Sequence, residues 1–485
     1  MVFSSHIFLF GFLPLALLLY GLMPRRGLNL LLTLLSYLFY GWTNPLFVLI
    51  LLFSTAVDYV AGLLMTAPAS LTRNDEIMPL PKRQARSRLQ KLTLWISLGS
   101  NLGLLGFFKY FNFGVDSFNA LAAVLGFEGL RLDGVVRVVL PLGISFYTFQ
   151  SMSYTIDVYR GNAKAIRNFV DFACYVSMFP QLVAGPIIRF SEVADQLISR
   201  VETREKMARG IAFFCLGLAK KVILANPCGK IADLMFDGGL PGCLDAWYGA
   251  AAYAFQIYFD FSGYSDMAIG LGLMLGFVFP KNFDSPYRSR SITEFWQRWH
   301  ISLSSWLKDY LYIPLGGNRG GAFRTYRNLM LVMLLGGLWH GAAWTFVVWG
   351  CLHGVWLAIE RWRGKRSFYR QLPGLLQVAV TFVLLLVSWV FFRAVDLPSA
   401  LLYLGRMFNL GMPDDGMLLV RGVVLQPYYM ITFIACCVVV WMAPQTWNWT
   451  RRLTLFKLVV TVVLLGISIV LLSIQAHNPF IYFMF

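Results

Sequence analysis

Apolar stretches separated by short polar segments run through almost the whole sequence. A helix needs about 20 mostly apolar residues to cross a bilayer, and only helices or closed barrels satisfy their backbone hydrogen bonds within lipid. The stretches that approach this length lie near residues 7–23, 28–42, 45–65, 92–111, 138–158, 207–226, 246–276, 374–396, 427–443 and 455–475. The pattern therefore predicts an all-α fold, a bundle of transmembrane helices.

The composition indicates the same class. Hydrophobic residues make up 58% of the 485-residue chain and charged residues 13%, whereas a soluble domain carries about 25% charged residues. We predict one membrane domain over residues 1–485. The net charge of +17 does not indicate nucleic acid, because Lys and Arg lie in short segments between apolar runs. The seven cysteines include no C-x-x-C pair, so they predict neither a zinc knuckle nor a disulfide framework.

Charge bias predicts the topology. Segment 66–91 has six basic residues and two acids, which places it in the cytoplasm with the N-terminus outside. Segment 277–327 has eight basic residues and three acids, and a further basic cluster lies at 361–366. The apolar sequence between these clusters must enter the membrane and return. His340-Gly341 lies near its midpoint, either at the tip of a full hairpin or in a half-depth re-entrant pair.

The segment around His300 has the pattern of an interfacial helix. Ser291-Ile-Thr-Glu294 matches a capping box, and an apolar stripe then alternates with polar positions through residue 311. We predict a continuous amphipathic helix that ends at Pro314 and the following glycines. His300 lies at the border of the stripe, where it serves either a functional site or the anchoring of the helix at the membrane surface.

His340 follows Gly336 and Gly337 and precedes Gly341. Such small residues allow close approach of helices or substrate. An ionisable group at this depth is by default a functional hypothesis, and a neutral imidazole suits a general base. The alternative is a histidine that only packs the hairpin. His353 is interpreted as a helix-packing residue, and no metal site is predicted because the histidines lack ligand spacing.

Polar residues also interrupt two apolar stretches. Gln150 belongs to one of these groups, and Asp260 and Tyr264 belong to the other. They indicate either a wet cavity or hydrogen bonds between helices. Lys220 and Lys221 are expected to reach the lipid headgroups in preference to binding a phosphorylated donor.

Several motifs together resemble one family, the membrane-bound O-acyltransferases, and within it the bacterial branch that O-acetylates exopolysaccharides such as alginate. The similar stretches cover nearly the entire chain: PLGISFYTFQ at 141–150, FPQLVAGPI at 179–187, residues 259–266, FWQRWHISLS at 295–304, GGNR at 316–319 and LWHG at 338–341. The resemblance implies the helical fold of that family, with re-entrant and interfacial helices.

The resemblance also implies a site and a reaction. His340 corresponds to the catalytic histidine and His300 to a second functional position, and the predicted substrate-binding residues are Trp299, Trp339, Arg298, Asn318, Asp260, Tyr264 and Gln150. It implies a multi-pass protein of the bacterial inner membrane, surrounded by lipid. No bound cofactor is expected; acetyl-CoA or another acyl thioester is the donor, a periplasmic acetyltransferase the partner and an exopolysaccharide the final acceptor. Acetylation of cellulose or another glycan, D-alanyl transfer to a cell-wall polymer and non-catalytic substrate transport remain alternatives.

Overall fold

The computed structural model describes residues 1–66, 79–82, 84–364, 367–409, 412–475 and 478–481. It is 74% helical, and no strand occurs in the described part of the chain, which confirms the predicted all-α class. The basic residues Arg73, Arg83, Lys365 and Arg366, on which the topology prediction partly depends, lie outside the described residues.

The chain forms two compact units, each described here by itself. The first contains residues 1–203 and 275–279. Its helices are α1 (Leu13–Leu22), α2 (Leu28–Gly41), α3 (Leu46–Thr66), α4 (Arg88–Val124), α5 (Ile144–Arg160), α6 (Phe169–Ser177), α7 (Phe179–Leu182) and α8 (Phe190–Ile198). Its core includes a buried polar contact: the Asn101 amide donates to Asp58 at 2.8 Å, and Ser97 donates to the same carboxylate at 2.6 Å.

The second unit contains residues 204–274 and 280–485. Its first helices are α9 (Arg204–Ala219), α10 (Asn226–Asp237) and the long α11 (Cys243–Met274). The chain continues with α12 (Ile292–Arg298), α13 (Ile301–Leu307), α14 (Gly321–His340), α15 (Trp344–Trp362), α16 (Gly374–Arg393), α17 (Leu397–Phe408), α18 (Asp415–Val424), α19 (Pro427–Trp441), α20 (Thr446–Trp449) and α21 (Leu455–Ile474). Whether the chain is one membrane domain stays a prediction.

Small residues bring α9 and α11 into backbone contact. A Cβ added at Gly217 would lie 2.5 Å from the Gly263 carbonyl oxygen, and one added at Gly263 would lie 2.7 Å from the Gly217 oxygen. Such close approach replaces a hydrophobic driving force where lipid is the solvent.

Two ion pairs connect the segment directly after α9 to α11. Lys221 lies 2.7 Å from Asp260 and is almost completely buried, and Lys220 pairs with Asp266 at 2.6 Å. The prediction that both lysines reach the lipid headgroups is therefore wrong. Their charges are instead neutralised between helices, because an unpaired ammonium group in an apolar interior is costly.

The C-terminal segment is inserted beside the Lys221–Asp260 ion pair. The second carboxylate oxygen of Asp260 accepts a hydrogen bond from the Ile481 backbone N–H at 2.8 Å. Lys221 donates to the Pro479 carbonyl, and the Phe480 ring lies 4.7 Å from the Tyr264 ring. Residues 479–481 thus form part of the core of the second unit.

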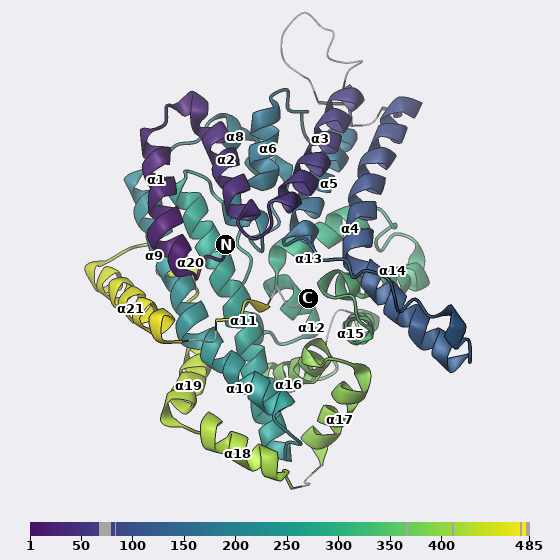
Figure 1. Ribbon diagram of the computed structural model, residues 1–485, viewed down its shortest axis with the longest axis vertical. Helices are drawn as coiled ribbons and strands as arrows, with labels where there is room; N and C mark the ends of the chain where they lie inside the picture. The colour runs from purple at the N-terminus through teal and green to yellow at the C-terminus, as the bar shows by residue number, and fades with distance from the viewer. Residues whose placement is uncertain (67–78, 83, 365–366, 410–411, 476–477, 482–485) are drawn as a thin grey trace, which may run out of the picture. The chain divides into compact units, whose positions relative to one another are not determined.

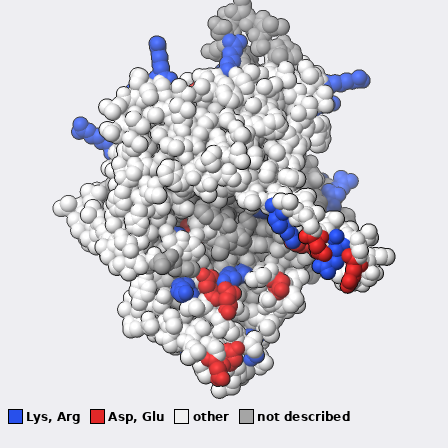
Figure 2. Space-filling model, viewed as in Figure 1, with Lys and Arg blue, Asp and Glu red and all other residues white. Residues whose placement is uncertain are grey.

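In the part of the chain that the structure describes, four helices are long and apolar enough to cross a membrane: Leu46–Thr66, Arg204–Asp237, Gly374–Arg393 and Leu455–Ile474. A pair bent by 73°, Asp415–Val424 with Pro427–Trp441, passes the same test together. The face in Figure 2 is mostly uncharged, with its charged side chains in small groups. These features are those of a membrane protein. The orientation in the membrane stays a prediction.

Candidate active site

His340 is the last residue of α14, directly before the turn that leads into α15. The two helices run side by side (Figure 1). A Cβ at Gly337 would lie 2.3 Å from the Phe346 carbonyl oxygen, and a Cβ at Gly350 would lie 2.5 Å from the Met333 oxygen. The glycines thus allow the helices to touch, as the sequence predicts for Gly337.

Aromatic rings surround the buried His340 imidazole. Its ring centroid lies 5.0 Å from Trp339, 5.3 Å from Trp349 and 5.2 Å from Phe392 of α16. The three rings meet the imidazole at steep angles of 68–85°, so edges face ring planes, as aromatic pairs prefer. This packing fixes where the imidazole lies.

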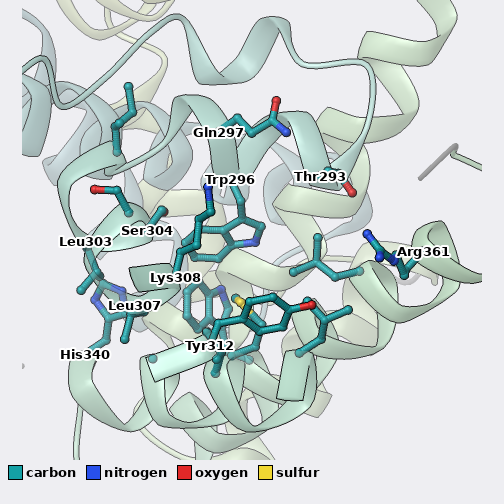
Figure 3. A pocket seen from close by; sticks show the side chains of 18 residues that line it. Thr293, Trp296, Gln297, Leu303, Ser304, Leu307, Lys308, Tyr312, His340 and Arg361 are labelled. Carbon is teal, nitrogen blue, oxygen red and sulfur yellow. The ribbon is translucent and has the colours of Figure 1, made fainter. Parts of the chain in front are cut away.

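One edge of His340 faces a cavity of about 430 Å³ between α12, α13, α14 and α15 (Figure 3). Most of the lining is apolar or aromatic: Trp296, Ile301, Leu303, Leu307, Tyr312, Leu329, Val332, Met333, Gly336, Trp349 and Leu357. Its charged members are Lys308 and Arg361, and Arg361 lies on the side away from His340 in Figure 3. The cavity therefore combines an apolar wall, one imidazole and two cations.

The predicted continuous helix around His300 is wrong. The chain forms α12, then breaks at Trp299 and His300, and resumes as α13. His300 adopts the left-handed conformation, with φ 44° and ψ 55°, which is uncommon for a residue with a Cβ. At the start of α12 the Ser291 hydroxyl accepts from the Glu294 N–H, as the capping box predicts, but the Glu294 carboxylate accepts from Arg290 and not from Ser291.

A polar frame holds the His300 turn. The Asn282 carbonyl accepts the Ile301 N–H at 2.9 Å, and its side-chain oxygen lies 3.2 Å from His300 Nδ1. The same oxygen accepts from the Ser302 N–H and hydroxyl at 3.2 and 2.9 Å. The His300 ring is fully buried and packs on Phe261, with ring centroids 4.6 Å apart.

Trp339 connects the two histidines. Its ring centroid lies 6.0 Å from the His300 ring and 5.0 Å from the His340 ring. The structure thus brings three of the predicted site residues together, although His340, and not His300, lines the cavity. Their catalytic and binding roles stay predictions.

The neighbouring predicted residues lie outside the cavity lining. Trp299 is buried among aromatic rings, with Phe283 at 5.1 Å and Trp389 at 5.2 Å. Arg298 is 2.7 Å from Glu294 and also donates to the Asp284 carbonyl. Asn318 is exposed in the loop before α14. For Trp299 and Arg298 these contacts favour a structural role in holding the His300 turn.

Asp260 and Tyr264 lie beside the C-terminal segment, where the Asp260 carboxylate is used by Lys221 and Ile481. Gln150 belongs to α5 of the first unit, and its buried amide has no hydrogen-bond partner among the described residues. Substrate contacts of these three residues stay predictions.

Three residues of the site carry no strong sequence signal. Asn282 follows α11 in an irregular segment, eighteen residues before His300, and no spacing rule connects the two. Lys308 is one of the polar positions between residues 291 and 311, and Arg361 belongs to the basic cluster at 361–366; neither pattern predicts a place in a cavity wall. Their positions depend on how α13 and α15 pack.

His353 has the packing role that the sequence favours. The Trp296 indole N–H donates to His353 Nδ1 at 3.2 Å, so Nε2 carries the proton and faces the Ser388 hydroxyl at 3.3 Å. In the described part of the chain, no group of three or more His, Cys, Asp or Glu side chains could hold a metal ion.

Helices of membrane-spanning length and a cavity with an imidazole in its wall define a polytopic membrane protein with a candidate active site. A sequence model of the membrane-bound O-acyltransferase family matches residues 162–393. The chain is 51% identical over 413 residues to the probable alginate O-acetylase AlgI of Azotobacter vinelandii, covering 85% of this chain and 79% of that protein.

Two further relatives give the same result. Identity to the probable alginate O-acetylase AlgI of Pseudomonas aeruginosa is 50% over 413 residues, covering 85% of this chain and 75% of that protein. Identity to the peptidoglycan O-acetyltransferase of Helicobacter pylori is 38% over 449 residues, covering 84% and 80%. The chain belongs to the membrane-bound O-acyltransferase family, and it is an O-acyltransferase.

Proposed function

We propose that this chain passes an acetyl group from a cytoplasmic thioester, acetyl-CoA, to an acceptor across the bacterial inner membrane for O-acetylation of an exopolysaccharide such as alginate. The names of the Azotobacter and Pseudomonas relatives support the polymer. The observation that carries the proposal is the position of His340 in the wall of an apolar cavity that also contains two cations.

His340 is the general base in this proposal. As the acceptor oxygen attacks the thioester carbonyl carbon, His340 takes the hydroxyl proton. The carbon–sulfur bond then breaks, an ester forms, and the departing thiolate takes the proton from the imidazolium. His300 orients the donor or polarises its carbonyl. The acceptor is a hydroxyl of a periplasmic acetyltransferase, which completes transfer to the polymer.

Lys308 and Arg361 suit a donor that carries phosphate groups. Neither side chain has an ion-pair partner among the described residues, and both line the cavity. Cations of this kind hold phosphate oxygens through charge-assisted hydrogen bonds. A coenzyme with several phosphates cannot enter hydrocarbon. Its phosphates would therefore remain near Lys308 and Arg361 while its acyl group reaches His340.

The polymer assay tests the reaction in cells. Cells without this chain receive the wild type, His340→Ala or His6→Ala, and mass spectrometry measures acetyl esters on the secreted polymer. His6 is exposed at the start of the chain and serves as the matched control. We expect His340→Ala to lower acetylation at least about a hundredfold at equal protein level, while His6→Ala restores it. Full acetylation with His340→Ala would falsify the base assignment.

A donor-exchange assay tests the thioester. The purified protein is given labelled acetyl-CoA or a labelled acyl carrier protein, together with its acceptor. We expect transfer from acetyl-CoA, with a higher KM in Lys308→Ala and Arg361→Ala than in the exposed control Arg451→Ala. Transfer of D-alanine from the carrier protein alone would instead support the D-alanyl alternative.

A further inference from the structure

The orientation of the Asn282 carboxamide is fixed by its partners. Its oxygen lies 3.2 Å from the Ser302 backbone N–H, a group that can only donate. Its nitrogen donates to the Ser265 hydroxyl at 2.9 Å. Exchanging the oxygen and nitrogen would place two donors against each other at Ser302, so the oxygen must face the His300 turn.

This orientation determines where His300 carries its proton. The Asn282 oxygen lies 3.2 Å from Nδ1 of His300, and an amide oxygen accepts but never donates. A bare Nδ1 would place two lone pairs against each other. Nδ1 therefore carries the hydrogen. Ser302 is compatible with this, because its hydroxyl proton points to the Asn282 oxygen at 2.9 Å and its oxygen faces Nδ1 at 3.4 Å.

The other ring nitrogen then presents a lone pair. In a neutral imidazole one nitrogen donates and the other accepts, so Nε2 of His300 is an acceptor. This atom is buried and has no hydrogen-bond partner among the described residues. A buried acceptor without a partner is costly, which is the property of a group that is satisfied when a substrate binds.

We infer that Asn282 is a positioning residue that holds His300 as the Nδ1–H tautomer and so commits Nε2 to accept a hydrogen bond from an N–H or O–H group of the substrate. The inference rests on the proposed function for the place of His300 beside the donor. Of the two roles given to His300, it selects orientation of the donor, because polarising a carbonyl would require a hydrogen on Nε2.

Two features of Asn282 make it suitable for this task. It is almost completely buried, and it binds the turn through both its main chain and its side chain. The turn therefore cannot rotate without breaking several hydrogen bonds. At metal sites, residues that orient an imidazole from behind in this way contribute about tenfold to hundredfold in affinity or activity, and we expect an effect of that size here.

Solid-state NMR of the full chain in lipid measures the tautomer of His300 in the absence of the acyl donor and the acyl acceptor. Histidine labelled with ¹³C and ¹⁵N gives ring shifts that differ between the two tautomers, and His300→Ala identifies the His300 signals by their loss. We expect hydrogen on Nδ1 and none on Nε2 in the wild type, and a mixture of tautomers in Asn282→Ala. Hydrogen on Nε2 in the wild type would overturn the inference, even if no variant folds.

The second test measures the activity of variants of Asn282 and Ser265. Acetyl esters on the secreted polymer should fall about tenfold to hundredfold in Asn282→Ala. Asn282→Asp keeps an oxygen opposite Nδ1 and should give at least ten times the Asn282→Ala value. Ser265→Ala removes only the contact on the far side of the amide and should stay within about threefold of wild type. Equal losses in Asn282→Asp and Asn282→Ala would overturn the inference.

The two proposals fail in different ways. If the wild type makes polymer esters in cells but does not use acetyl-CoA after purification, the proposed donor is wrong while the NMR result and the Asn282 comparison still stand. If the wild type uses acetyl-CoA and the NMR spectrum places hydrogen on Nε2, the proposed function stands and the role of Asn282 is wrong.

Discussion

The two histidine turns of the second unit are held in place by different kinds of contact. His300 lies in a left-handed break between short helices, and its ring is held by a hydrogen bond to the Asn282 side-chain oxygen and a contact with the Ser302 hydroxyl. His340 lies at the end of a long helix, and the rings of Trp349 and Phe392 enclose it. Both imidazoles contact Trp339.

The difference separates two tasks. Hydrogen bonds choose which nitrogen carries a proton, because each partner is a donor or an acceptor. Edge-to-face ring contacts fix the position of a ring but do not select which of its nitrogens carries the proton. A histidine that exchanges a proton during a reaction is suited to the second kind of support, and one that only orients a substrate is suited to the first.

Removal of a ring from the His340 frame should have the largest effect. Phe392 is buried against Phe346, Trp349 and His340, so Phe392→Ala leaves a cavity and should lower the free energy of unfolding by about 3–5 kcal/mol. Thermal unfolding in detergent measures this, with Phe323→Ala as the control because that side chain is 80% exposed. Equal unfolding midpoints for the two variants would show that the rings do not support the turn.

Adjacent glycines in α14 provide a matched pair with a smaller effect. Gly337→Ala places a methyl group against the backbone of α15 and should cost about 1–3 kcal/mol. Gly336→Ala meets only the Leu307 side chain at 3.6 Å, an ordinary contact. Unfolding midpoints should fall in Gly337→Ala and stay close to wild type in Gly336→Ala. The reverse order would contradict the packing of the hairpin.

Substitutions at His300 separate backbone conformation from imidazole chemistry. His300→Ala and His300→Gly both remove the ring, but only glycine adopts the left-handed conformation without strain. We expect His300→Gly to be more stable than His300→Ala by about 1 kcal/mol in unfolding measurements, while both lose polymer acetylation. A more stable alanine variant would mean that the helix continues through residue 300 in solution.

The smallest expected effect concerns Asp414, which lies away from both histidine turns. Its loss of stabilisation at low pH limits the pH range over which activity can be measured. Asp414 accepts the backbone N–H groups of Leu240 and Met417, and these bonds lower its pKa from the usual 3.8. Its stabilising effect is present above the unfolded pKa and is lost as pH falls through the lower folded pKa. Unfolding midpoints measured below about pH 4 should therefore decline less in Asp414→Asn than in wild type.

Long apolar runs predicted the helices, and the basic clusters on both sides of the apolar sequence around His340 predicted the hairpin, because both are local signals. These signals did not predict the break at His300. The apolar stripe continues across residue 300, and the hydrogen bonds that stabilise the break are accepted by Asn282, in another segment. The burial of Lys221 was missed for the same reason, since its carboxylate partner is on a different helix.

Where each candidate residue of the motifs lies depends on the helices and side chains that pack around it. His340 and Trp339 meet where the motif predicts, because they are adjacent in the chain at the end of one helix. Arg298 lies equally close to His300 in sequence, yet the salt bridge to Glu294 takes its guanidinium away from the cavity. Sequence alone cannot predict which member of such a motif faces inward, because helix packing decides it.

The insertion of residues 479–481 has a consequence for biosynthesis. Asp260 and Ile481 are separated by 221 positions, and Lys221 and Pro479 by 258, so the core around this ion pair closes only after the ribosome has made residue 481. A chain stalled or clipped before residue 479 leaves these polar groups without their backbone partners. Such a chain should therefore unfold more easily than one that extends through residue 481.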